Sequence, residues 1–252
     1  SADGSYKYVA NANAVSAAGG TDSFTYTIED GDGDRSTTTL TFTIKDSGLT
    51  TTPDDPNGAA APGNITVNEF ALASGSNAAS TTETAAGTLS ASGGTGPYSY
   101  AISGSGSGSF GTMTIGASGS YSYTLTKATT DLVGNETETF TYTATDALGN
   151  TATNTVTVNI TDDVPTANAD TATITEGTTS TVAVASGVLS NDVLGADLGK
   201  TGGAVVGVKA GNSGTEVTTG VASNITGTFG TLTLSADGSY KYVANANAVS
   251  AA

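Results

Sequence analysis

The sequence predicts an all-β protein made of tandem β-sandwich domains, for three reasons. First, apolar and polar residues alternate with a period of two in several segments, among them Phe24-Thr-Tyr26-Thr-Ile28, Leu40-Thr-Phe42-Thr-Ile44 and Val156-Thr-Val158-Asn-Ile160. Such alternation buries one face of a strand and leaves the other face in water. Second, 34 glycines and many Asn and Asp residues supply turns between these segments. No segment shows the apolar spacing of an amphipathic helix.

The third reason is internal repetition. Residues 1–18 (SADGSYKYVANANAVSAA) recur without change at 235–252. Weaker matches lie inside that period, 110–123 with 229–242 and 21–46 with 137–162. Each long repeat therefore contains two diverged domains of similar size. That size suits a seven-stranded immunoglobulin-like sandwich, which has about 100 residues.

These matches divide the chain into four parts. We expect 1–50 to hold the last three strands of one sandwich (E to G), 51–63 to be a linker, 64–163 to form a complete sandwich, and 164–252 to hold strands A to E of the next. The strands of the complete sandwich are expected at 64–70, 85–91, 98–103, 110–115, 120–126, 138–145 and 152–160.

The two partial domains would each expose an apolar face and unpaired sheet edges. We therefore expect a neighbouring copy, or the rest of a longer chain, to complete them. The alternative is that the two ends simply fray. Completion by strand exchange between copies would make the chain a subunit of a self-assembling filament.

Composition excludes several functions. Seven Lys+Arg against 23 Asp+Glu give a formal net charge of −16, which repels nucleic-acid phosphates and anionic lipids. A helix that spans a membrane needs about 18 consecutive apolar residues, and no apolar run in the sequence approaches that length. We therefore expect no membrane insertion. The chain has no Cys and no His, and therefore lacks disulfides, thiol chemistry and the commonest general base. Paired acids such as Asp162-Asp163 fall in a linker, so we expect no enzyme.

Several motifs resemble one family. They are residues 230–249 (GTLTLSADGSYKYVANANAV), 20–44 (GTDSFTYTIEDGDGDRSTTTLTFTI), 187–192 (GVLSND) and 159–167 (NITDDVPTA). Together they resemble the VCBS and cadherin-like repeats of giant RTX-type bacterial adhesins. The resemblance implies a protein that type I secretion exports to the bacterial cell surface. Its repeats would extend a terminal adhesive domain for cell adhesion or biofilm formation, with calcium at the joints and neighbouring repeats as partners.

Strand order predicts where metal ligands gather. Successive loops of a sandwich alternate between its two ends, so each joint collects the linker and the loops of two domains. The acids expected at or near such joints are Glu69, Asp162, Asp163, Asp170 and Asp192. A wider supply of acids in the neighbouring loops consists of Asp131, Glu136, Glu138, Asp197 and Asp237. Glu176 is expected at the next joint along the chain. Calcium takes six to eight oxygen ligands, often from carboxylates, so we predict calcium there. The alternative is that these acids are solvated loop residues that keep the chain soluble.

A Gly-rich acidic turn is a second candidate. Asp30, Asp32 and Asp34 alternate with glycine between two expected strands, and Asp146 holds the place of Asp30 in the middle domain. The run is similar to the start of an EF-hand loop, but Arg35 stands where that loop needs glycine. Two interpretations remain open, a tight hairpin turn alone and a hairpin turn that also binds a cation.

A glycan-binding module is the third possible function, after an extender and a filament subunit. Sugar sites often stack ligands on exposed aromatic rings. Pairs of tyrosines recur in one register, namely Tyr6 and Tyr8, Tyr121 and Tyr123, and Tyr240 and Tyr242. Recurring pairs on one face of a strand indicate core packing. Tyr98 and Tyr100 remain as the aromatic candidates for sugar binding.

Overall fold

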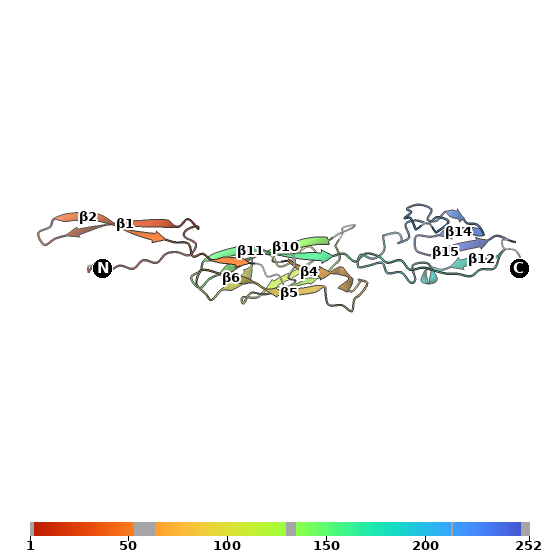
Figure 1. Ribbon diagram of the computed structural model, residues 1–252, viewed down its shortest axis with the longest axis horizontal. Helices are drawn as coiled ribbons and strands as arrows, with labels where there is room; N and C mark the ends of the chain where they lie inside the picture. Colours follow the sequence, from red (N-terminus) through yellow and green to blue (C-terminus); the bar gives the residue numbers. More distant parts are fainter. Residues whose placement is uncertain (1–2, 53–63, 130–134, 213, 248–252) are drawn as a thin grey trace. The chain divides into compact units, whose positions relative to one another are not determined.

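The computed structural model describes residues 3–52, 64–129, 135–212 and 214–247 (Figure 1). In these ranges the regular structure is strand, apart from two single-turn 3-10 helices, η1 (Glu69–Ala71) and η2 (Val184–Ser186). None of the described helices is long and apolar enough to cross a membrane. The prediction of an all-β chain is confirmed.

Contacts divide the chain into two compact units. Unit 1 contains Ser1–Val67, Thr84–Thr124 and Thr137–Ile160, and unit 2 contains Asn68–Glu83, Leu125–Glu136 and Thr161–Ala252. Residues around η1 follow the first strand of the middle domain, and the sequence predicts that they lie near the joint with the next domain. They belong to the same unit as the residues that follow β11.

Two sheets form the middle sandwich (Figure 1). One has the order β4-β11-β10-β7, with bounds Asn64–Asn68, Thr151–Thr161, Asn135–Thr145 and Ser99–Ile102. The other has the order β5-β9-β8, with bounds Thr84–Thr88, Ser120–Leu125 and Gly111–Ile115. Each of the seven strands expected from the sequence coincides with one of these. Along β11, Val156, Val158 and Ile160 are buried and the residues between them are partly exposed, as a period of two requires.

The sandwich core contains both aliphatic and aromatic side chains. Tyr123 from β9 packs against Phe140 from β10, with ring centroids 5.8 Å apart. The largest fully buried side chains include Tyr123, Tyr142, Ile65, Met113, Leu125 and Ile160. Of the recurring tyrosine pairs, Tyr121 and Tyr123 therefore have the core role that their register predicted.

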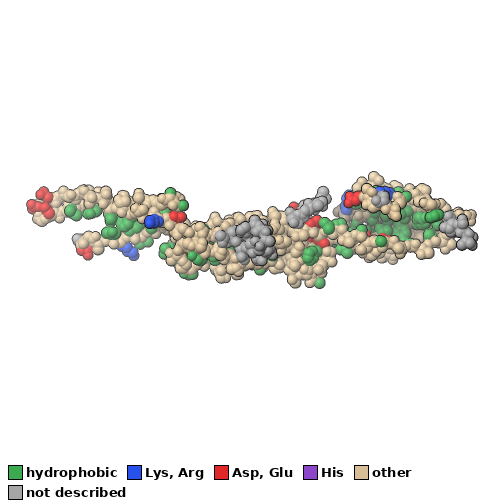
Figure 2. Space-filling view, viewed as in Figure 1, with side chains coloured by type: hydrophobic (Ala, Val, Ile, Leu, Met, Phe, Trp, Pro, Cys, Tyr) green, Lys and Arg blue, Asp and Glu red, His purple; other side chains and the backbone are tan. Residues whose placement is uncertain are grey.

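Residues 20–44 form a two-stranded sheet of β1 (Gly20–Glu29) and β2 (Arg35–Ile44). One face of this hairpin carries threonine and serine, and the hydroxyls of Ser23 and Thr41 hydrogen-bond across it at 2.9 Å. The other face is apolar and carries Phe24, Tyr26, Ile28, Leu40 and Phe42. Much of that face is exposed, and apolar side chains gather on this part of the chain in Figure 2.

The predicted linker 51–63 begins with a strand. β3 (Thr50–Thr52) pairs antiparallel with β6 (Ser90–Ser92), and Nδ2 of Asn154 donates to the carbonyl oxygen of Thr51 at 2.8 Å. The first linker residues are therefore tied to the middle sandwich, which agrees with the strand preference of β-branched threonine. Residues 53–63 lie outside the described residues.

Residues 164–247 contain one four-stranded sheet of order β12-β15-β14-β13. The bounds are Thr179–Val182, Tyr240–Ala244, Gly230–Leu234 and Asn224–Thr226. The expected strand A is not formed, and residues 167–176 have no regular structure. In the middle sandwich the matching strand β4 pairs with β11. The described part of 164–247 has no counterpart of β11, and a lone strand without a hydrogen-bonding neighbour is not stable.

Candidate metal centre

Three carboxylates from separate segments meet within unit 2. Glu69 opens η1, Asp162 follows the last residue of β11, and Asp197 lies in the turn that begins at Gly195. Each offers a carboxylate oxygen, and these oxygens all lie within 4.8 Å of one another. Carboxylates this close repel one another, and a cation between them would offset that repulsion. Clustered carboxylate oxygens are the ligand type that calcium prefers.

Glu69 is the deepest member of this acid cluster. Its side chain is 0% exposed, and its Oε1 accepts a hydrogen bond from the backbone N–H of Thr129 at 2.6 Å. Its Oε2 is buried and has no hydrogen-bond partner among the described residues. Leaving a buried carboxylate oxygen without a donor costs free energy, so such an atom calls for an explanation. A cation at the cluster would supply the missing interaction.

The other two acids leave the cluster open to solvent. Asp162 is half-buried and Asp197 is exposed. An ion could therefore reach Glu69 from the surface while the Glu69 carboxylate holds it from the protein side. The residues fit a hard cation with oxygen ligands, and further ligands would come from water or carbonyl groups.

Hydrogen bonds hold the segments around the cluster together. The N–H and Oγ of Ser76 donate to Oδ2 and Oδ1 of Asp163 at 2.8 and 2.6 Å. Oγ of Ser74 donates to the carbonyl oxygen of Ala196 at 3.0 Å. Gly195 has φ 77°, and a Cβ at this position would lie 2.0 Å from the carbonyl oxygen of Asp163. Only glycine allows the turn that carries Asp197 to approach so closely.

The structure brings some predicted ligands together and separates others. Glu69 and Asp162 meet, and Asp197 joins them from the wider acid supply. Both carboxylate oxygens of Asp163 accept hydrogen bonds from Ser76. Asp163 therefore links the segment after η1 to the segment after β11, and it is not one of the three acids of the cluster. Oδ1 of Asp192 accepts the N–H of Asn168 at 2.7 Å. The remaining predicted ligands of this part of the chain, Asp170 and Glu176, are both exposed.

Two acids of the wider supply have other roles. Oε2 of Glu138 accepts a hydrogen bond from the hydroxyl of Tyr123, and Oε1 accepts the N–H of Phe110, so Glu138 lies inside unit 1. The expectation that Glu138 joins the acids of the joint is wrong. Oδ1 of Asp237 accepts the Oγ and N–H of Ser239, and these two bonds lower the pKa of Asp237. Asp131 lies outside the described residues.

The Gly-rich acidic turn forms a second, fully exposed cluster. Asp30, Asp32 and Asp34 each offer an oxygen within 4.8 Å of the others. Oδ1 of Asp30 accepts the N–H groups of Asp32, Gly33 and Asp34 at 3.3, 3.1 and 2.9 Å. Hydrogen bonding to the Asp32 side chain, and then to these backbone groups, lowers the pKa of Asp30. The hairpin is confirmed, and a cation at its turn stays a prediction.

Asp146, at the matching turn of the middle sandwich, is buried and fully hydrogen-bonded. Its Oδ1 accepts the N–H groups of Leu148 and Asn150, both at 2.9 Å. Its Oδ2 accepts the N–H of Thr95 and the side-chain amide of Asn150, both at 3.0 Å. The Asn150 amide is the main cause that lowers the pKa of Asp146 to about 2. Asp146 belongs to neither acid cluster of the described residues, and its visible role is to close this turn.

The two aromatic candidates for sugar binding do not form an open platform. Tyr100 is buried, and its ring centroid lies 6.5 Å from that of Tyr142. Tyr98 is half-buried, and its hydroxyl donates to the carbonyl oxygen of Gly93 at 2.7 Å. Tyr100 therefore has a core role, and the expectation that it presents an exposed ring is wrong.

Known proteins give one family match. Residues 1–43 match the family described as Bacterial Ig domain. Among solved structures, the chain is similar to the protocadherin GammaB4 extracellular domain, with 14% identity and a TM-score of 0.32. That similarity covers 88% of this chain and 36% of the protocadherin chain, so the present chain spans about a third of its length. No curated protein matches the chain. The first part of the chain is thus similar to bacterial immunoglobulin-like domains.

Proposed function

We propose that this chain is an extender segment of a secreted bacterial surface adhesin, and that calcium stiffens its joint. Successive sandwiches would give the adhesin its reach, and the net charge of −16 would keep long chains soluble. The match of residues 1–43 to bacterial immunoglobulin-like domains supports the domain type. The observation that carries the calcium part is the meeting of Glu69, Asp162 and Asp197 around a buried, unpartnered carboxylate oxygen.

The acid cluster joins segments that are far apart in the sequence. Glu69 follows β4, Asp162 follows β11, and Asp197 belongs to the chain beyond the joint. When bound, calcium would supply positive charge that offsets the three carboxylates. The three residues would then hold η1, the end of β11 and the turn at Gly195 in one arrangement. The Ser76–Asp163 hydrogen bonds already limit movement beside the cluster.

The finer parts of the proposal follow the resemblance to VCBS and cadherin-like repeats of RTX-type adhesins. In that setting the neighbours of this segment are further repeats of the same kind, and type I secretion exports the protein. Cell adhesion or biofilm formation would then depend on a terminal adhesive domain, which reaches other cells or their glycans because the repeats hold it away from the surface.

Thermal unfolding of the 252-residue chain tests the calcium part. The melting temperature is measured at fixed ionic strength with millimolar calcium, with magnesium and with chelator. A ligand that binds only the folded state raises stability by mass action. Extracellular calcium sites bind at about 10⁻⁴–10⁻³ M, so millimolar calcium approaches saturation. We expect calcium to raise the melting temperature more than magnesium does.

Two charge-matched variants locate the effect. Glu69→Gln keeps the shape of the side chain and removes its charge, so the calcium response should disappear. Without calcium the same variant should be at least as stable as the parent, because a buried charge has been removed. Glu216→Gln removes one exposed acid outside the cluster and should keep the full calcium response. Equal calcium responses in the parent and the Glu69→Gln chain would refute the site.

Stiffening needs a separate measurement. Small-angle X-ray scattering of the chain in calcium and in chelator reports the range of its conformations. We expect a narrower distribution of maximum dimensions with calcium. A calcium-dependent melting temperature without any change in scattering would show a stabilising ion that has no mechanical role.

A further inference from the structure

The loop that precedes β1 contacts the turn between β10 and β11 through two asparagine side chains. The backbone N–H of Asn13 donates to Oδ1 of Asn150 at 3.1 Å. In return, Oδ1 of Asn13 accepts the backbone N–H of Thr151 at 2.8 Å. All three residues belong to unit 1, although Asn13 and Asn150 are 137 residues apart in the sequence. This reciprocal pair therefore joins two distant segments of the unit.

Asp146 determines how the amide of Asn150 is oriented. Its Oδ1 accepts the backbone N–H of Asn150, and its Oδ2 accepts the side-chain amide of the same residue. An ionised carboxylate can only accept hydrogen bonds, so the amide nitrogen of Asn150 must face Asp146. The amide oxygen is then on the side that faces Asn13. The turn thus presents a fixed acceptor to the loop before β1.

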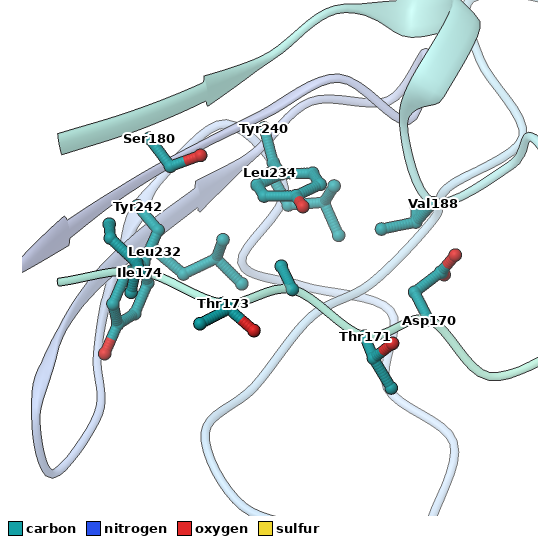
Figure 3. Close-up of a pocket in the computed structure, with 11 residues that line it drawn as sticks. Asp170, Thr171, Thr173, Ile174, Ser180, Val188, Leu232, Leu234, Tyr240 and Tyr242 are labelled. Atoms are coloured by element: carbon teal, nitrogen blue, oxygen red, sulfur yellow. The ribbon is translucent and has the colours of Figure 1, made fainter.

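The loop brings its own fixed shape to this contact. Asn13 has φ 54°, in the left-handed region that asparagine tolerates better than most residues. The same four residues, Ala-Asn-Ala-Asn, end at Asn247, which has φ 55°. Their surroundings differ, because the second copy follows β15, whose Tyr240 and Tyr242 line the hollow in Figure 3, whereas residues 6–10 belong to no strand. The local sequence therefore sets this backbone conformation before any contact is made.

The segment after the β1–β2 hairpin is fixed beside the same turn. The carbonyl oxygen of Ser47 accepts the N–H of Gly94 at 2.9 Å. The next residue, Gly48, lies so close to Gly93 that a Cβ on Gly93 would meet its carbonyl oxygen. One hollow of about 300 Å³ is lined by residues of the loop, the segment after β2 and the turn, namely 9–15, 44–47, Leu148 and Asn150. Contacts to the middle sandwich therefore come from both sides of the hairpin.

The groups that meet in the asparagine pair are neutral. Two amide oxygens accept hydrogen bonds from two backbone N–H groups, and none of these four groups carries a charge. Screening by salt acts on charges, and removal of a cation changes only the sites that bind it. The cluster of Glu69, Asp162 and Asp197 is different, because its three carboxylates repel one another when no cation is present.

We propose that the Asn13–Asn150 pair holds the joint before the middle sandwich in one geometry without the help of a cation. The segment then has joints of two kinds. Neutral hydrogen bonds hold the first, and the calcium proposed above stiffens the second. Removing calcium should loosen the second joint and leave the first unchanged. Neither asparagine belongs to the acid cluster, so a failure of the calcium proposal would not affect this inference.

Distance measurements across the joint provide the first test. The chain has no Cys, so two introduced cysteines are the only sites at which spin labels attach. Thr21→Cys and Ser118→Cys place the labels at exposed positions of β1 and of the turn before β9. Double electron–electron resonance on the labelled 252-residue chain then gives the distribution of distances. We expect a narrow distribution of equal width in calcium and in chelator. A distribution that narrows only with calcium would overturn the proposal.

Three variants separate the amide contact from the shape of the loop. Asn13→Gly allows the left-handed backbone and removes the acceptor oxygen, so the ratio of docked to undocked molecules should fall about fivefold and the distribution should broaden. Asn13→Asp keeps an acceptor oxygen and should keep the narrow distribution. Asn247→Gly makes the same change in the second copy of the loop and should also leave the distribution unchanged. Equal widths for the parent and Asn13→Gly would refute the inference.

Amide hydrogen exchange gives a local readout that distinguishes a loosened joint from an unfolded turn. The N–H of Thr151 donates to Asn13, so it should exchange about fivefold faster in Asn13→Gly than in the parent. The N–H of Asn150 donates to Asp146 and should exchange at the same rate in both chains. An unchanged rate at Thr151 would show that the contact is not made in solution. Faster exchange at both amides would show that Asn13 supports the turn and not the joint, and either result would overturn the proposal.

Discussion

The hydroxyl of Tyr123 donates a hydrogen bond to Oε2 of Glu138 over 2.5 Å in the core of the middle sandwich. The second oxygen of Glu138 accepts the N–H of Phe110 at 2.8 Å, so neither carboxylate oxygen lacks a donor. Burial is the main cause that raises the pKa of Tyr123, and the hydrogen bond to Glu138 adds to it. The tyrosine therefore remains a protonated donor, and a buried acid is stable because a strand on the opposite sheet supplies its partner.

Removing this donor should destabilise the sandwich. Tyr123→Phe leaves Oε2 of Glu138 buried without its hydrogen bond, and we expect the free energy of unfolding to fall by about 1–3 kcal/mol. Urea denaturation followed by circular dichroism measures the loss. Tyr98→Phe is the control, because the Tyr98 hydroxyl donates to the carbonyl oxygen of Gly93 at an exposed position. Strictly additive effects of Tyr123→Phe and Glu138→Gln in a double-mutant cycle would contradict a direct interaction.

Asp146 should make stability depend on pH in the acid range. Its pKa is about 2 in the folded chain, against an ordinary value of 3.8. A lowered folded pKa stabilises the folded state above the ordinary value, and this contribution is lost as pH falls from about 4 towards 2. Asp146→Asn should therefore be less stable than the parent at neutral pH, and the difference in free energy of unfolding should shrink across that window.

Asn150 allows a check on the cause of this pH dependence. Its side-chain amide contributes most to the low pKa of Asp146. Asn150→Ala should therefore shift the acid loss of stability to higher pH. A difference between the parent and Asp146→Asn that stays constant from pH 7 to pH 2 would show that the four hydrogen bonds do not depend on the charge.

The turn that carries Asp197 should not tolerate a side chain at Gly195. Gly195 and Gly211 both have positive φ, 77° and 91°, so alanine at either position should cost about 1–2 kcal/mol of backbone strain. A Cβ at Gly211 has no atom within 4 Å, whereas one at Gly195 lies 2.0 Å from the backbone of Asp163. Gly195→Ala should lower the melting temperature more than Gly211→Ala and should also weaken the calcium response. Equal effects would indicate that the turn adapts freely.

Ser76 should contribute to the same joint through its hydroxyl. Ser76→Ala removes the 2.6 Å bond to Oδ1 of Asp163 and keeps the backbone N–H bond to Oδ2. Hydrogen bonds to charged groups contribute about 1.5–3 kcal/mol, so thermal unfolding should show a clear loss. Ser118→Ala removes an exposed hydroxyl and serves as the control. A loss no larger than that of the control would mean that water replaces the Ser76 hydroxyl.

The strands of the middle sandwich could be predicted from the sequence because each buries one face, and a period of two records that directly. The missing strand A of residues 164–247 could not, because segment 170–174 has strand-like sequence but no partner for its backbone. Thr50–Thr52 was missed for the opposite reason. Its sequence is polar throughout, and pairing with β6 alone makes it a strand.

The acid cluster was only partly predictable. Glu69 and Asp162 follow from which loops share an end of a sandwich. The sequence does not distinguish Asp197 from the other acids of this part of the chain. Its position in the cluster depends on tertiary contacts, namely the close approach of Gly195 to Asp163 and the Ser74–Ala196 hydrogen bond. The sequence around Asp146 does contain a local signal, but this signal indicates a turn and not a metal ligand. An aspartate four residues before an asparagine, with a glycine between them, is typical of a turn that the aspartate itself closes.

The cluster of Glu69, Asp162 and Asp197 draws its acids from three segments that no short stretch of sequence contains. An EF-hand loop, by contrast, carries its ligands within one segment of about 12 residues. A calcium ion at the cluster would therefore bind only after η1, the end of β11 and the turn at Gly195 have folded together, so calcium binding would report the folding of all three at once.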